Sequence, residues 1–332
     1  MRPAGLLVLV AALAWPAASA AATTPGCRLS TVAEWPVRLD RGLPLTAGSV
    51  NGRPVSVMID TGASATVITT AAAERLGLTL QRTGARMRAI GGDTRVYQAR
   101  IAELRIGGAS HGAMRVRVAG EHPIPGVDVI VGEDVLHAFD LEFDFAKGMV
   151  RAFDAQDCKG AWLAYWDANA QVLPVEYDTS AVRIPLSING ERALALLDSG
   201  ASRTLVSLAF ARQLGVAPGA PGVSLASCAS GLGAGVVQAW SAHFDRVQLA
   251  GETIRDARIA FADFTLAEDW PLEGAPALLH AERNPDVLLG TDFLRAHRVL
   301  VARSQDRVYF TYLGGSVFPA TPPARCEERR MQ

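Results

Sequence analysis

Met-Ile-Asp-Thr-Gly-Ala-Ser at residues 58–64 and Leu-Leu-Asp-Ser-Gly-Ala-Ser at residues 196–202 are two copies of one phrase. Each copy is an apolar run that stops at a single carboxylate and continues with a hydroxyl residue, a glycine and two small residues. One such string arises often by chance, whereas two copies in matching contexts indicate two carboxylates that act at one site. Asp60 and Asp198 are therefore the first candidates for functional residues.

The register between the two copies extends well beyond the phrase. The two aspartates lie 138 positions apart, and the same offset aligns Pro36 with Pro174, Asp40 with Asp178, Asn51-Gly52 with Asn189-Gly190, and Leu76-Gly77 with Leu214-Gly215. A match over about 40 residues without a gap indicates an internal duplication.

Each half of the chain follows the same plan of short strands and turns. An Asn-Gly turn predicts a hairpin before each aspartate, and Gly77 or Gly215 ends a short helix after it. A glycine-rich hairpin comes next, and a second apolar run then ends at Gly132 or Gly290. Many short strands with turn signals at regular spacing predict an all-β fold.

The second half carries about 20 extra residues, because the offset grows to 158 between Gly132 and Gly290. The best place for them is the segment from Phe264 to Pro285. A loop of this length is unusual unless it is functional or mobile. One hypothesis is that this insert holds the protein in a latent state.

The N-terminus has the pattern of a secretory signal peptide. Met1-Arg2 is a positive start, Leu6 to Ala14 is an apolar run, and Ala18-Ser19-Ala20 is a small-residue cleavage site. The alternative is a membrane anchor, for which the run is short. We expect cleavage after Ala20, a periplasmic or secreted protein, and no stable membrane insertion.

Charge and cysteine content narrow the remaining choices. The net charge of −1 gives no basic surface for nucleic acid. An even number of cysteines in an exported protein predicts two disulfides, and four cysteines allow three pairings. We favour Cys27–Cys158, because these two residues bracket the first half of the chain, which leaves Cys228 with Cys326. The cysteines lie far apart and have no histidine at ligand spacing, so a zinc site is not expected. We expect no metal and no other cofactor.

The predicted organisation has five segments. They are a signal peptide at 1–20, a first lobe at 27–158, a connector at 159–173 that is rich in aromatic residues and packed, a second lobe at 174–317, and a tail at 318–332.

A pseudo-twofold axis between duplicated halves would bring Asp60 and Asp198 together. Two adjacent carboxylates cannot both be ionised, so they share one proton. The ionised member can then act as a general base on water, while the protonated member hydrogen-bonds the scissile carbonyl of a substrate. Hydrolysis by such a pair needs no metal and no covalent intermediate.

The residues beside each aspartate have roles of their own. Gly62 and Gly200 allow the backbone to turn tightly next to the carboxylate. We expect the hydroxyls of Thr61 and Ser199 to bond the backbone of the opposite loop. The last residues of the phrase, Ser64 and Ser202, could donate to the carboxylates. For Asp134 and Asp292 we expect a structural role, as a helix N-cap or in an ion pair.

The chain resembles the retropepsin-type aspartic proteases, the retroviral-protease-like branch of the pepsin clan, in a duplicated single-chain form. The resemblance rests on Asp60-Thr61-Gly62-Ala63-Ser64, on Asp198-Ser199-Gly200-Ala201-Ser202, and on the segments at Gly132 and Gly290. It implies a closed β-barrel lobe in each half, an active site between the lobes, and glycine-tipped flaps over the cleft. The flaps correspond to Ile90-Gly91-Gly92 and to the region of Gly231 and Gly233. Because one chain encodes both halves, the resemblance also implies a monomer.

Two functional hypotheses remain. The first is an exported aspartic endopeptidase that acts on a peptide or protein substrate. The second is a catalytically silent peptide-binding module on the same fold. Loss of catalysis usually removes an Asp or Gly of the phrase, and all four are intact here, which favours hydrolysis.

Overall fold

A computed structural model of the chain describes residues 26–120, 122–176, 181–264, 267–269 and 284–319. The predicted signal peptide, Cys326 and most of the predicted insert lie outside the described residues. Strands dominate, and the helices are short: α1 (Thr70–Arg75), α2 (Glu133–Leu136), α3 (Leu208–Gln213) and α4 (Thr291–Ala296), with the 3-10 turns η1 (Phe145–Lys147) and η2 (Arg303–Gln305). No helix of the described segments is long and apolar enough to cross a membrane. The all-β prediction is confirmed.

The first lobe is the sheet that carries Asp60. Its strands, in order across the sheet, are β21 (Ala267–Asp269), β6 (Gln81–Ala89), β7 (Gly92–Ile101), β10 (Met114–Ala119), β5 (Val67–Thr69), β11 (Val129–Val131), β4 (Arg53–Ile59), β3 (Leu43–Val50), β8 (Leu104–Ile106) and β9 (Ala109–His111), and β2 (Arg38–Asp40) also pairs with β3. Two residues separate β7 from β8, and their N–H groups donate to Asn51 Oδ1 at 2.7 and 3.2 Å. The β3–β8 pairing therefore turns the sheet back towards β7.

The second lobe is the sheet that carries Asp198. It runs in the order β15 (Arg183–Ile188), β16 (Glu191–Leu197), β22 (Val287–Leu289), β17 (Leu205–Ser207), β20 (Glu252–Ala262), β19 (Val237–Leu249) and β18 (Ser224–Ala229). An additional pairing between β15 and β19 closes this sheet into a barrel.

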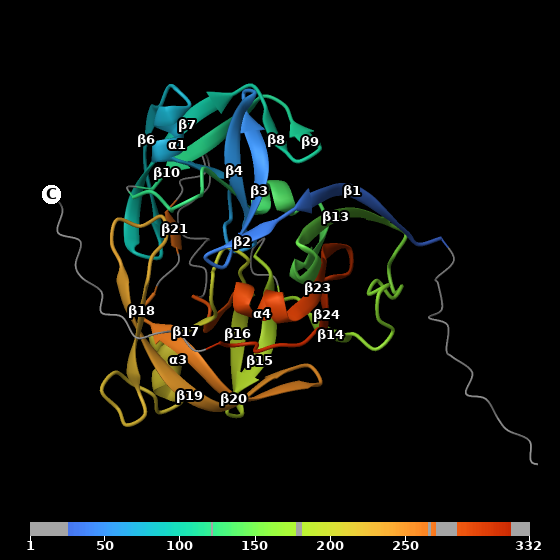
Figure 1. The fold of residues 1–332 in the computed structure, drawn as a ribbon, viewed down its shortest axis with the longest axis vertical. Helices are drawn as coiled ribbons and strands as arrows, with labels where there is room; N and C mark the ends of the chain where they lie inside the picture. The colour runs from blue at the N-terminus through green and yellow to red at the C-terminus, as the bar shows by residue number, and fades with distance from the viewer. Residues whose placement is uncertain (1–25, 121, 177–180, 265–266, 270–283, 320–332) are drawn as a thin grey trace, which may run out of the picture.

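The two lobes repeat the same unusual strand pairing. In the first lobe β4 pairs in parallel with β11 and β5 with β10. In the second lobe β16 pairs in parallel with β22 and β17 with β20. The lobes lie at opposite ends of the molecule in Figure 1, with the first lobe at the top. The duplication read from the sequence is therefore a duplication of the fold.

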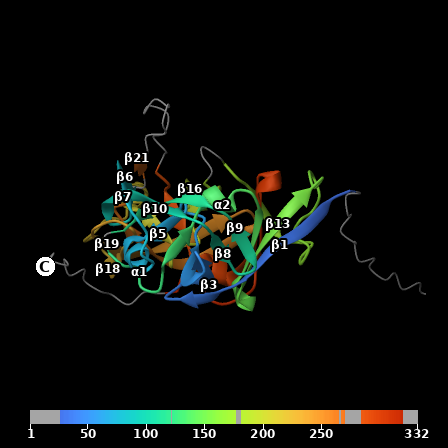
Figure 2. The same ribbon diagram turned by 90° about the horizontal axis from the view of Figure 1, so that it is seen from above.

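A third sheet joins the lobes and takes three strands from each half. Its order is β1 (Arg28–Pro36), β13 (Met149–Gln156), β12 (Asp140–Asp144), β23 (His297–Ala302), β24 (Arg307–Tyr312) and β14 (Gln171–Pro174). At its centre Leu141 pairs with Val301, Glu142 with Leu300, and Phe143 with Val299. Adding the offset of 158 to a residue number converts the first of these pairs into the third and maps Glu142 onto its own partner, Leu300. The pseudo-twofold axis therefore passes through the Glu142–Leu300 pair. Figure 2 shows β1 and β13 of this sheet running side by side away from the first lobe.

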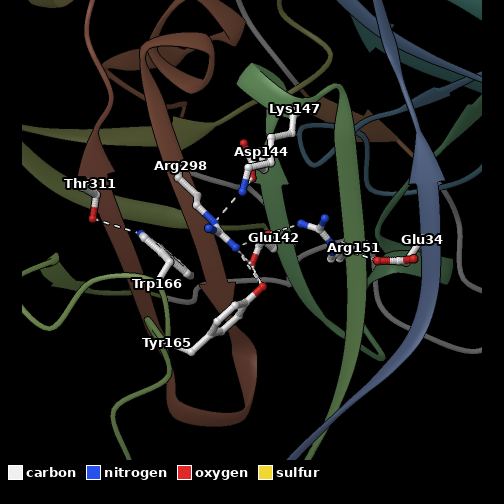
Figure 3. Close-up of polar contacts among 9 residues, drawn as sticks. All are labelled: Glu34, Glu142, Asp144, Lys147, Arg151, Tyr165, Trp166, Arg298 and Thr311. Carbon is white, nitrogen blue, oxygen red and sulfur yellow. Dashed lines mark hydrogen bonds and ion pairs between the residues drawn. The ribbon is translucent and has the colours of Figure 1, made fainter. Parts of the chain in front are cut away.

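A network of buried charged residues surrounds Glu142 of this pair (Figure 3). The Glu142 carboxylate is fully buried and accepts hydrogen bonds from Arg151 at 2.6 Å, from Arg298 at 3.1 Å and from the Tyr165 hydroxyl at 2.6 Å. Arg298 also lies over the Trp166 ring at 4.5 Å from its centroid. A buried carboxylate is stable only when it is paired in this way. The network thus links the first half, the connector and the second half.

The connector packs on the joining sheet as a small second core. Leu163, Ala164 and neighbouring connector residues cluster with Phe153, Leu300 and Tyr309. The Cys27–Cys158 disulfide closes the edge of this region, as predicted from the sequence. Cys228 is also disulfide-bonded, and Cys326, its predicted partner, lies outside the described residues.

Candidate active site

The parallel strand pairs place both aspartates at equivalent points. The N–H of Asp60 donates to Val131 O and that of Asp198 donates to Leu289 O, each at 3.0 Å. Val131 and Leu289 are followed by Gly132 and Gly290, which lie very close to the aspartate loops. A Cβ added at Gly132 would be 2.6 Å from the backbone of its loop, and one added at Gly290 would be 2.5 Å from the backbone of the other. The apolar run that ends in glycine is therefore the support against which each loop packs.

The two aspartate loops meet at the axis. A Cβ at Gly62 would lie 2.4 Å from the Asp198 carboxyl carbon, and a Cβ at Gly200 would lie 2.3 Å from that of Asp60. Each glycine thus leaves the space that the opposite carboxyl group occupies. The carboxyl groups of Asp60 and Asp198 are therefore neighbours across the axis.

Thr61 and Ser199 join the loops beneath the carboxyl groups. The Thr61 hydroxyl donates to Leu197 O at 2.6 Å, and the Ser199 hydroxyl donates to Ile59 O at 2.8 Å. Each hydroxyl oxygen also accepts from the backbone N–H of the other residue at 3.1 Å. Both side chains are fully buried, so water does not compete for these bonds.

Backbone donors orient the two carboxylates. Asp60 Oδ1 accepts from the N–H groups of Gly62 and Ala63 at 2.9 and 3.1 Å. Asp198 Oδ1 accepts from the equivalent groups of Gly200 and Ala201, both at 2.9 Å. Ser64 and Ser202 follow directly in the same loops, and donation from their hydroxyls to the carboxylates stays a prediction.

Burial raises the pKa of both carboxyl groups above the ordinary value of 3.8. The negative charge of Asp198 raises the pKa of Asp60 further, while backbone hydrogen bonds to each carboxylate act in the opposite sense. Because the two groups interact directly, they titrate as a pair. The pair retains one proton at a pH where an exposed carboxyl group has lost its own.

The two predicted flaps meet above the carboxyl pair. The first is the β6–β7 hairpin with Ile90 and Gly91 at its tip, and the second is the loop between β18 and β19. Gly233 N donates to Ile90 O at 3.1 Å, and Gly235 N donates to Gly91 O at 2.8 Å. A Cβ at Gly233 would lie 2.3 Å from Gly91 C. Glycine is therefore required where the tips touch. Gly92 begins β7 behind the first tip, and Gly231 approaches Ile90.

Each flap also packs against the opposite lobe. Ile90 of the first flap joins the apolar cluster of the second lobe around Leu196 and Leu288. Leu232 of the second flap joins the cluster of the first lobe around Leu45 and Met58. The flaps and loops enclose a cavity of about 420 Å³ that both aspartates line.

The insert reaches the first flap, which the sequence did not predict. Its described strand β21 pairs antiparallel with β6, with Ala267 opposite Arg88 and Asp269 opposite Arg86. In Figure 1 the label of β21 lies beside the first-lobe hairpin, although the strand belongs to the second half of the chain. The first flap is therefore a three-stranded element that both halves build.

The helix N-cap expected of Asp134 and Asp292 is wrong. The caps are Gly132 and Gly290. Asp134 instead accepts from the Thr66 hydroxyl and Asp292 from the Thr204 hydroxyl, each at 2.7 Å. These bonds tie each short helix to the strand that follows the aspartate loop. Asp134 and Asp292 therefore have the structural role that was expected, but they fulfil it by accepting from a threonine hydroxyl and not by capping a helix.

Glu133 is a further carboxyl group that sequence reasoning missed. It lines the cavity, is buried, and forms an ion pair with Arg303 of the second half. Burial raises the pKa of Glu133 to about 7, against the lowering effect of Arg303. The sequence did contain a signal for it, because Glu133 follows Gly132 directly, whereas the equivalent residue after Gly290 is the uncharged Thr291. Among the described residues, no group of three or more His, Cys, Asp or Glu side chains could hold a metal ion.

Two lobes of one fold, each ending a buried strand in aspartate, define an aspartic protease scaffold. Residues 46–138 match the family described as "gag-polyprotein putative aspartyl protease", and residues 184–293 match the family described as "Aspartyl protease". No curated protein matches the chain. The two matches lie in tandem and together cover more than half of the chain, and the first contains Asp60 and the second Asp198. The chain belongs to the retropepsin-type aspartyl proteases and carries the domain twice.

Proposed function

We propose that the protein is an exported aspartic endopeptidase in which Asp60 and Asp198 activate water. The observation that carries this proposal is the buried, adjacent pair of carboxyl groups beside a cavity that two flaps cover. A fold kept only for binding would not need this pair, because burying a carboxylate is costly unless it is compensated.

The pair provides both halves of acid–base hydrolysis. The ionised carboxylate accepts a proton from a water molecule, which attacks the carbonyl carbon of the scissile bond. The protonated carboxyl donates a hydrogen bond to the carbonyl oxygen, on which negative charge develops. Collapse of the tetrahedral intermediate transfers a proton to the leaving amine and regenerates the shared-proton pair. The loop backbone around Gly62 and Gly200 holds both groups in place throughout.

Export and a monomeric state belong to the same proposal. Disulfide bonds form and persist in oxidising compartments, and Cys27, Cys158 and Cys228 are all disulfide-bonded. One chain supplies both aspartates and both flaps, so a partner copy is not needed to complete the site. We also propose lobe boundaries of 27–158 and 174–317, with residues 159–173 as the connector.

A transition-state mimic separates the enzyme from a silent peptide-binding module. A statine-type peptide carries a hydroxyl in place of the attacking water, which the carboxyl pair can bind. The enzyme should bind it much more tightly than the matched amide peptide, by about 100-fold or more, and the preference should vanish in Asp198→Asn. Equal affinity for the two peptides would favour the silent module.

A further inference from the structure

The two walls of the cleft differ at one pair of equivalent positions. Leu45 of β3 pairs with Met58, and at the offset of 138 Arg183 of β15 pairs with Leu196. Leu45 packs into the apolar cluster of the first lobe. Arg183 instead lines the cavity, with only 2% of its surface exposed. At this position the duplication thus has an aliphatic side chain in the core of the first lobe and a guanidinium at the cavity in the second lobe.

The strand pairing places Arg183 on the face of the second-lobe sheet that leads to Asp198. Residues directly opposite on antiparallel strands share a face, so Arg183 and Leu196 point to the same side. Alternation along a strand carries that side from Leu196 to Asp198. Both Leu196 and Asp198 line the cavity. A substrate side chain against the second-lobe wall would therefore lie within reach of Arg183.

A second exchange adds positive charge at one end of the cleft. Arg203 stands where the first half has Ala65, and both Arg203 and Arg41 line the cavity. Their neighbours in the chain, Gly42 and Ser202, approach each other closely, because a Cβ at Gly42 would lie only 2.9 Å from Ser202 Cβ. Among the described residues that line the cavity, the acidic side chain besides the carboxyl pair is Glu133, which is paired with Arg303. The whole chain has a net charge of −1, so this basic character is local.

We propose that the second-lobe wall of the cleft is a subsite for an acidic side chain of the substrate, with Arg183 as its counter-ion, and that the first-lobe wall accepts an apolar side chain. A guanidinium has five N–H donors in a planar fork, so it can hold a carboxylate bidentately and keep other contacts. Arg41 and Arg203 add an attractive field along the path of an acidic peptide. This inference rests on the proposed peptidase function and names its substrate class.

The test compares peptides that differ at one position. A cleavable peptide is scanned with Glu, Gln and Lys at each position flanking the scissile bond, and kcat/KM is measured for the wild type, Arg183→Leu, Arg183→Lys and Arg192→Leu. Arg192 is an exposed arginine on β16 that does not line the cavity, so it controls for the loss of one positive charge. Unfolding temperatures identify any variant that fails to fold.

The wild type should cleave the Glu peptide about 10-fold or more faster than the Gln peptide at one position, the size expected of one charge-assisted hydrogen bond. Arg183→Leu should bring that ratio close to one, Arg183→Lys should retain part of it, and Arg192→Leu should retain all of it. Equal rates for the Glu, Gln and Lys peptides in the wild type would overturn the proposal, as would an unchanged ratio in a folded Arg183→Leu variant.

Binding to the Asp198→Asn variant separates this inference from the function it rests on. Fluorescence anisotropy with the same peptides reports the Glu preference without turnover. A Glu preference in binding with no cleavage by the wild type would refute the peptidase and keep the acidic subsite. Cleavage with no Glu preference in rate or binding would refute the subsite and keep the peptidase.

Discussion

The hydroxyls of Thr61 and Ser199 lie across the pseudo-twofold axis from each other, and each accepts a hydrogen bond from the other's backbone N–H at 3.1 Å. Each also donates to a carbonyl of the opposite lobe. The lobes are thus joined directly below the carboxyl pair, where a small shift of either loop would separate the two aspartates.

Removing either hydroxyl should therefore cost both stability and activity. Thr61→Ala or Ser199→Ala loses one donor and leaves buried backbone groups of the other lobe without a partner, which should lower the free energy of unfolding by about 2–3 kcal/mol. Urea unfolding measures the stability, and kcat/KM on a peptide measures the activity. The exchanges Thr61→Ser and Ser199→Thr keep the hydroxyl and should stay close to the wild type. Equal losses in the Ala and hydroxyl-retaining variants would show that the bonds themselves do not matter.

The contact between the flap tips makes Gly233 sensitive to a single methyl group. Gly233→Ala would place Cβ 2.3 Å from Gly91 C, so the tips must move apart over the cavity. We expect kcat/KM to fall by about 10-fold or more, because a displacement near 1 Å at a site can cost up to two orders of magnitude. Gly108→Ala is the matched control, since a Cβ there meets no atom within 4 Å. Normal activity in Gly233→Ala would mean that closed flaps are not required.

The pH dependence of stability should carry the signature of the buried pair. The pKa of Asp60 is raised well above 3.8 in the folded protein. The folded protein therefore binds a proton at this carboxyl group more tightly than the unfolded chain does. The stability from this pair is fully present below the unfolded pKa and is lost as the pH rises through the folded pKa. Each pH unit within that window removes up to about 1.4 kcal/mol per proton.

Asp60→Asn removes this pH-dependent loss. Its unfolding temperature should exceed that of the wild type at pH 7 and 8, and the two curves should converge towards pH 4. Thermal unfolding from pH 4 to 8 in constant salt checks the sign. A difference that grows as the pH falls would contradict the raised pKa.

The Cys27–Cys158 disulfide should stabilise the joining sheet and the first lobe. It closes a loop of 131 residues, and a loop of that size corresponds to about 4–5 kcal/mol in the chain-entropy treatment. The double variant Cys27→Ser with Cys158→Ser should unfold at a clearly lower urea concentration than the wild type. Reduction with dithiothreitol should lower the urea midpoint of the wild type to a value similar to that of the double variant. The midpoint of the double variant itself should change less on reduction.

The repeated phrase was enough to predict the two-lobed architecture, because it is backed by turns and glycines at one constant offset. Asp60, Thr61 and Gly62 have symmetric partners, so each of their contacts could be inferred from the duplication. The strand β21 could not be predicted, since it pairs with β6 of the other half and nothing in its local sequence specifies a partner so distant in the chain. The buried network around Glu142 was hidden for a similar reason, because its members come from three segments.

Arg183 is an intermediate case. The offset of 138 already aligned it with Leu45, so the sequence contained the exchange of an aliphatic residue for a guanidinium. Only the pairing of Arg183 with Leu196, on the face that leads to Asp198, showed that the exchange lies in the cleft. Divergence between the halves is therefore most informative where the fold places it beside the carboxyl pair.

The most direct test of the account is peptide hydrolysis by purified Asp198→Asn protein beside the wild type, over pH 3 to 8. The variant keeps the shape of the side chain and removes the shared proton. We expect the wild type to cleave and the folded variant to lose activity by at least about four orders of magnitude, a conservative share of the acceleration that enzymes achieve. Hydrolysis by the variant at the wild-type rate would contradict the account.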